Sequence, residues 1–188
     1  MNIKSTEVLN ELVSCFLLGD IAVLQRYKAE EGLPDDLATE FTTQKTGDEV
    51  VIKGVVIPLM DIENYPYTVI FRLSDDTPEL LQEGNDLQVK QGGYILEVTS
   101  GEVMLFGWRV LEHFTGETID KLKQYQHQYN RPKINLENGW YSVKILAGQT
   151  RQGECLEPTL EFVFTKIPSA TPCAADIFTS YRIRSDEY

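Results

Sequence analysis

The sequence predicts an α+β protein whose mainly antiparallel β-sheet is built from hairpins. Two observations predict this class. From Phe41 onward, short runs alternate apolar and polar residues, which is the period of a half-buried strand. Turn signals separate these runs, and the strands do not alternate regularly with long helices as they do in a parallel sheet. The chain has 188 residues, 42% of them hydrophobic, so we expect a single α+β domain over residues 1–188.

The N-terminal region has helical spacing, and we expect a helical pair there over about residues 5–31. Thr6 is placed to cap the first helix, and Asp20 is placed to cap the second. Gly32 followed by Pro34 is a typical signal for the end of a helix.

The rest of the chain is predicted to form a β-rich body over about residues 39–184. β-Branched and aromatic residues with a period of two replace the helical spacing there. The first expected parts of this body are a hairpin that joins Thr39–Lys45 to Glu49–Leu59, a strand at Tyr67–Leu73, and a polar connector at 74–86 with one turn of helix at Pro78–Gln82.

A hairpin over residues 94–110 has the most regular pattern in the chain. With Ser100-Gly101 as its central turn, one face of the pair is entirely apolar, and a shift by one residue would mix the two faces. The same register places Trp108 opposite Gly93, where the indole would cover the glycine.

An amphipathic helix near residues 117–130 is expected next, capped at Thr115 and ended before Pro132. Its predicted apolar stripe consists of Ile119, Leu122, Tyr125 and Tyr129. Asn138-Gly139 then predicts a second hairpin. The last expected elements are a loop at 148–158, a strand at Leu160–Ile167, a loop at 168–176 and a strand at 177–184.

The charge of the chain limits the partners that it can bind. Its 29 acidic and 17 basic residues give a net charge of −12, which argues against binding nucleic acid or an anionic membrane through bulk electrostatics. No apolar run is long enough for a membrane span or an export signal. Cys15, Cys155 and Cys173 are odd in number and far apart, which suits free thiols. We therefore expect a cytoplasmic protein.

The sequence contains no recognisable constellation of catalytic or metal-binding residues. His113 and His127 are the two histidines, and the acidic stretches do not match a Ca²⁺ loop. A nucleophile pair of Cys155 with His113 is the alternative that we keep, and it would make the protein a small hydrolase or transferase with an unrecognised site. Otherwise we predict no catalytic residues, no metal and no cofactor.

Two segments that contain acids and no bases are the clearest functional signal. Residues 30–40 and 75–86 each contain five acidic residues. Acidic loops attract cationic proteins and speed their encounter, although such loops also serve only to keep an acidic protein soluble. The predicted partner-binding residues are Asp35, Asp36, Asp75, Asp76, Glu79, Glu83 and Asp86, with Trp140 as a further aromatic anchor.

These features favour a non-catalytic acidic binding protein with a basic protein as its partner. A bacterial immunity protein that neutralises a cationic nuclease toxin has this electrostatic character, because its acidic side chains mimic the phosphates that the nuclease binds. A small-ligand binder with a pocket around Trp108 and Tyr94 is the other alternative.

Overall fold

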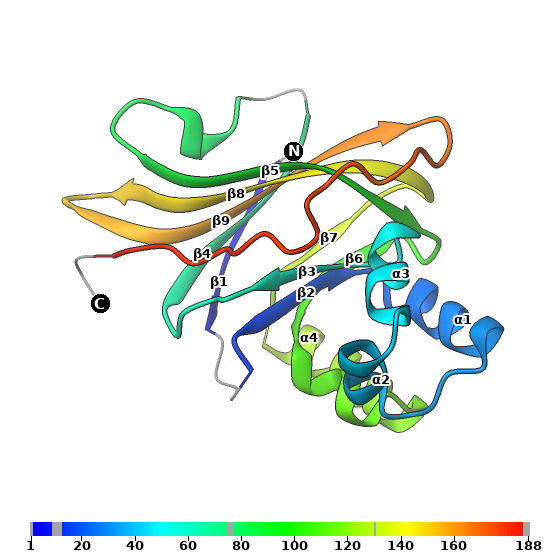
Figure 1. The fold of residues 1–188 in the computed structure, drawn as a ribbon. Helices are drawn as coiled ribbons and strands as arrows, with labels where there is room; N and C mark the ends of the chain where they lie inside the picture. Colours follow the sequence, from blue (N-terminus) through cyan, green and yellow to red (C-terminus); the bar gives the residue numbers. More distant parts are fainter. Residues whose placement is uncertain (1, 9–12, 75–76, 130, 186–188) are drawn as a thin grey trace.

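A computed structural model describes residues 2–8, 13–74, 77–129 and 131–185. They form two β-sheets, with the helices gathered at one end, at the lower right of Figure 1. One sheet has five strands in the order β1 (Asn2–Val8), β4 (Pro66–Leu73), β9 (Cys155–Ile167), β8 (Gly139–Gln152) and β5 (Asp86–Val98). The other has four strands in the order β3 (Val56–Met60), β2 (Cys15–Gly19), β6 (Glu102–Gly107) and β7 (Lys133–Asn135).

The helical elements complete this arrangement. They are α1 (Ile21–Glu31), α2 (Leu37–Thr43), α3 (Thr46–Ile52), α4 (Gly116–Gln128) and two 3₁₀ segments, η1 (Glu79–Leu81) and η2 (Trp108–His113). All strand pairs within the sheets are antiparallel except β4 with β9. The predicted α+β class with mainly antiparallel sheets is therefore confirmed. No helix within the described ranges is long and apolar enough to cross a membrane.

The hydrophobic core lies between the two sheets and includes buried side chains from both. On β9, alternate residues point into it, and the ring of Phe162 lies 5.4 Å from that of Phe71 on the neighbouring strand β4. Leu18 on β2 contributes from the other sheet and is completely buried. Alternation along each strand therefore gives each sheet an apolar inner face.

The predicted N-terminal helical pair is wrong in its first half. Residues 2–8 form the edge strand β1, and Cys15–Gly19 form β2, which is hydrogen-bonded to β3 on one side and β6 on the other. All five residues of β2 are buried, and a strand buried on both faces has a continuous apolar run that resembles a buried helix in sequence. The second helix is α1, with Asp20 as its N-cap and Gly32 at φ 64° as its C-cap.

The hairpin predicted over Thr39–Lys45 and Glu49–Leu59 is also wrong, because α2, α3 and β3 occupy this region. The Asp36 side chain accepts a hydrogen bond from the backbone N–H of Thr39, which caps α2. The Thr42 hydroxyl donates to the carbonyl of Ala38, one turn earlier. β-Branched residues suggested strands here, but local capping and burial of Val50 against the core favour helices.

The hairpins predicted at 94–110 and around Asn138-Gly139 are wrong in their pairing, although the predicted turns do separate strands. β5 pairs with β8, and β6 pairs with β2 and β7, so the chain passes from one sheet to the other at both turns. Trp108 begins η2 and does not cover Gly93, where the backbone of Ala174 approaches instead. Each apolar face is compatible with either partner, so the alternation could not distinguish them.

Three further assignments concern the second half of the chain. Helix α4 is confirmed, with Thr115 as its N-cap. The predicted loop at 148–158 is wrong, because β8 and β9 continue through this range up to a tight turn between Gln152 and Cys155. The predicted last strand at 177–184 is wrong, because this range begins with a turn at residues 177–178 and has a single β-bridge, between Ser180 and Met60.

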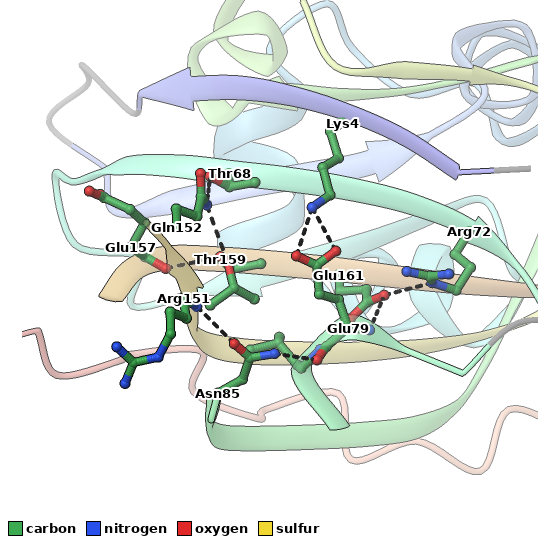
Figure 2. Close-up of polar contacts among 12 residues, drawn as sticks. Lys4, Thr68, Arg72, Glu79, Asn85, Arg151, Gln152, Glu157, Thr159 and Glu161 are labelled. Atoms are coloured by element: carbon green, nitrogen blue, oxygen red, sulfur yellow. Dashed lines mark hydrogen bonds and ion pairs between the residues drawn. The ribbon is translucent and has the colours of Figure 1, made fainter. Parts of the chain in front are cut away.

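Residues 77–85 of the predicted polar connector cross the outer face of the five-stranded sheet and contain the predicted turn of helix, η1. Figure 2 shows what holds it in place. The carboxylate of Glu161, completely buried on β9, accepts hydrogen bonds from the backbone N–H groups of Glu79 and Leu80 at 2.9 Å each. The same carboxylate forms an ion pair with Arg72 at 2.8 Å. On the same face, Lys4 on β1 pairs with the side chain of Glu79.

Candidate functional site

An apolar groove of about 180 Å³ opens on the surface where α2, α3, β3 and the C-terminal segment meet. We call it the α2–α3 groove. It is lined by Leu17, Phe41, Thr42, Gly47, Asp48, Val50, Val51, Val56, Pro58, Met60, Trp108, Ile177 and Phe178.

The strand side of the groove is β3, the edge strand of the four-stranded sheet. β3 pairs with β2, through register pairs such as Leu17 with Pro58, and on its other side Met60 forms a single β-bridge with Ser180. Proline has no N–H to donate and is tolerated on an edge strand. At the end of β3, Met60 is 37% exposed.

The C-terminal segment forms a further rim of the groove beside the end of β3, and it presents Phe178 to solvent. The side chain of Asp176 accepts a hydrogen bond from the backbone N–H of Phe178 at 3.1 Å, and the phenyl group is 76% exposed. Three residues later the chain is firmly held, because Tyr181 is completely buried and its N–H donates to the carbonyl of Met60 at 2.9 Å. Phe178 is thus an exposed aromatic ring on an anchored backbone.

The helical side of the groove belongs to an acidic segment of the chain. Between residues 30 and 53 the chain has seven acids and two lysines. Asp48 is exposed and lines the groove itself. Lys53 forms an ion pair with Glu31 at 2.6 Å, and the hydrogen bond to that carboxylate raises the pKa of Lys53. The segment that forms the helical side therefore has a net negative charge, and Asp48 is its acid that lines the groove.

Asp35 and Asp36 lie between α1 and α2, at the same end of the molecule as the groove. Asp35 forms an ion pair with Lys28. Asp36 caps α2, and hydrogen bonds from the backbone and side chain of Thr39 lower the pKa of its carboxyl, with a smaller contribution from His113. Both side chains are exposed.

Of the other predicted acids, Glu79, Glu83 and Asp86 lie between η1 and the start of β5, at the far end of the molecule, at the upper left of Figure 1. Asp75 and Asp76 are outside the described residues. Glu79 is engaged with Lys4 and β9, Glu83 is exposed, and Asp86 begins β5. The described parts of the two acidic segments therefore do not lie together on one surface.

Trp140 is half-buried on β8. It does not pack under α4, because its ring lies against the turn that joins α3 to β3. A Cβ atom built on Gly54, which has φ 72°, would come within 2.9 Å of the indole. This contact gives Trp140 a packing role, and its role as a partner-binding anchor stays a prediction.

The residues of the two alternative functions are not brought together. Cys155 follows the β8–β9 turn at one end of the five-stranded sheet, whereas His113 ends η2, which packs on α2 at the other end (Figure 1). Trp108 lines the α2–α3 groove, but the hydroxyl of Tyr94 is buried and accepts a hydrogen bond from Tyr181 at 3.1 Å. Among the described residues, no three His, Cys, Asp or Glu side chains are grouped as metal ligands.

Comparison with known proteins gives distant structural similarities. No family model and no curated protein matches the chain. One similar solved structure is ComJ from Bacillus subtilis, an inhibitor of the DNA-degrading activity of NucA, with 13% identity, a TM-score of 0.44, and coverage of 89% of this chain and 96% of that one. Another is the product of crocagin biosynthetic gene J, with 12% identity, a TM-score of 0.46, and coverage of 87% and 97%.

The sequence predicts Asp35 and Asp36, which lie at the same end of the molecule as the groove, but it predicts neither Asp48 nor the apolar part of the groove. It places Phe178 in an alternating strand and Phe41 in a hairpin. The one local signal was Asp176 two residues before Phe178, a spacing at which aspartate bonds to the backbone and forms a turn. The groove itself depends on segments more than a hundred residues apart, such as α2 and the C-terminal segment.

Proposed function

We propose that this protein is a non-catalytic, acidic binding protein that neutralises a cationic protein partner, such as a nuclease toxin. The observation that supports the proposal is the α2–α3 groove: an apolar slot beside an exposed phenylalanine, next to a segment with seven acids and two lysines. An apolar centre within a charged rim is the usual organisation of a protein–protein interface.

The two parts of this surface have different roles in binding. Burial of an exposed aromatic ring against a partner supplies affinity, since a few central aromatic residues dominate most interfaces. The surrounding carboxylates attract a basic partner and speed association. We therefore expect Phe178 to control dissociation, and Asp48 to control association.

The test is a kinetic comparison with a basic nuclease encoded by a neighbouring reading frame. We expect stoichiometric inhibition of its DNA cleavage. Phe178→Ala should speed dissociation about 30-fold, equivalent to a hot-spot loss of about 2 kcal/mol. Asp48→Lys should mainly slow association, and raising the salt concentration should reduce this difference, because the Debye length is about 8 Å at physiological ionic strength.

Glu83→Lys is the matched control, because it makes the same charge change on an exposed acid at the other end of the molecule. It should leave both rate constants nearly unchanged at physiological salt. Equal effects of Glu83→Lys and Asp48→Lys on the association rate would mean that this rate depends only on the net charge of the chain. Unchanged dissociation in Phe178→Ala would remove the groove from the interface, and failure to inhibit any cationic neighbour would contradict the proposed function.

A further inference from the structure

A second groove of opposite character runs between η2 and α4. It consists of two adjoining hollows of about 630 and 350 Å³ that share four lining residues. Of these, Val110 and Leu122 pack against the core and form an apolar floor. We call this surface the η2–α4 groove.

Two tyrosines of α4 stand out from this surface. Sequence spacing places Tyr125 and Tyr129 on the apolar stripe with Ile119, but they are 52% and 58% exposed. Their rings stack on each other, with centroids 5.6 Å apart and planes 17° apart. Tyr125 also lines both hollows. Exposed tyrosines supply large contact areas at little entropic cost and are enriched at binding surfaces.

The charge around this groove is opposite to that of the rest of the chain. Residues 103–133 contain five lysines and arginines against three acids, in a protein of net charge −12. Arg109, Lys121 and Arg131 line the hollows. They form ion pairs with Glu112, Glu117 and Glu7, of which Glu112 also lines the larger hollow, and their side chains remain 79%, 63% and 48% exposed.

A buried side-chain amide at the floor of the η2–α4 groove has an unpaired hydrogen-bond acceptor. Gln126 is 1% exposed and lines the smaller hollow. Its Nε2 donates to the carbonyl of Leu105 at 3.1 Å, but its Oε1 has no hydrogen-bond partner among the described residues. Buried acceptors are rarely left unpaired, so a missing donor is expected close by. The backbone N–H of a bound peptide is such a donor.

We infer that the η2–α4 groove binds a short acidic peptide segment of another protein, one that also carries an apolar or aromatic side chain. The cations select its carboxylates, and the apolar floor with Tyr125 receives the side chain. Small movements of Gln126 bring its Oε1 to the peptide backbone. This site is independent of the α2–α3 groove and of the proposed function.

The test uses a fluorescein-labelled peptide, acetyl-Glu-Leu-Glu-Tyr-Glu-Leu-amide, and a counterpart with Lys in place of each Glu. Fluorescence polarisation should show saturable binding of the acidic peptide alone. Arg109→Glu combined with Arg131→Glu should weaken binding at least about tenfold, and Tyr125→Ala about fivefold. In NMR spectra, the side-chain amide signals of Gln126 should shift as the acidic peptide is added.

Lys90→Glu is the control, because it places the same charge change on an exposed lysine of β5. It should leave the affinity unchanged. Equal weakening by Lys90→Glu would show non-specific attraction and overturn the inference, as would binding of both peptides or of neither. Sedimentation that shows self-association, abolished by Arg109→Glu, would assign the groove to a second copy of this chain instead.

Discussion

Removal of the buried carboxylate of Glu161 should be strongly destabilising. The Glu161→Ala substitution removes the buried carboxylate that pairs with Arg72, which is 5% exposed, and it removes the acceptor of the N–H groups of Glu79 and Leu80. Breaking a buried ion pair from one side costs about 3–5 kcal/mol, because the remaining charge stays buried. Each orphaned N–H adds about 1–3 kcal/mol if water cannot reach it. We therefore expect a loss of at least about 3–5 kcal/mol.

A double-mutant cycle isolates the ion pair from the backbone contacts. Arg72→Met combined with Glu161→Leu removes both charges and keeps apolar volume, so it should cost clearly less than the sum of the two single substitutions. Urea unfolding followed by circular dichroism gives the free energies, and hydrogen exchange should show faster opening of residues 77–86. A cost below about 1 kcal/mol for Glu161→Ala, or strict additivity of the double variant, would refute this account of Figure 2.

Three further outcomes follow from single contacts. Gly93→Ala should cost about 2–4 kcal/mol in urea unfolding, since φ is 89° and a Cβ would lie 2.8 Å from the backbone of Ala174; a change below about 1 kcal/mol would contradict the close approach. Asp20→Ala should cost about 2–4 kcal/mol, because this buried carboxylate caps α1 and accepts two N–H bonds at 2.7 Å from the turn after β5; a melting temperature equal to that of the wild type would exclude this role. Burial raises the pKa of both Tyr94 and Tyr181, so the folded state retains protons that the unfolded state loses above about pH 10. The free energy of unfolding should therefore fall as the pH rises beyond that value. If the phenolate absorbance of all tyrosines rose before the circular dichroism changed, this prediction would be contradicted.

The parts of the fold that depend on local chemistry could be predicted from the sequence. The caps at Asp20 and Thr115 and the stop at Gly32 place α1 and α4 correctly, because each cap satisfies backbone groups only a few residues away. Strand pairing could not be predicted in the same way. Val103 faces Ile134 on β7 and not a residue of β5, as the predicted hairpin over residues 94–110 would require, although both pairings bury the same apolar residues.

The candidate site also has one part that the sequence could predict and another that it could not. The acidic character of residues 30–40 is a property of composition and needed no structure. The grouping of Phe178 with Met60 and Trp108 is not a property of composition, because it results from the C-terminal segment running beside the edge of β3. Nor could the sequence show that Tyr125 lies outside the core, since the helical stripe continues past the point where the core ends.

The separation of the acidic segments determines how their charges can act on a bound partner. A globule of this length has a radius of gyration of about 16 Å, so its opposite ends lie several Debye lengths apart at physiological salt, where that length is about 8 Å. A partner in the α2–α3 groove then feels Asp48 and Asp36, while Glu83 is screened. At about 0.01 M salt the Debye length grows to about 30 Å, and every carboxylate of the chain contributes to the encounter. The salt concentration at which Glu83→Lys begins to slow association therefore indicates where the binding surface lies. Asp48→Lys should slow association both at about 0.01 M salt and at physiological salt.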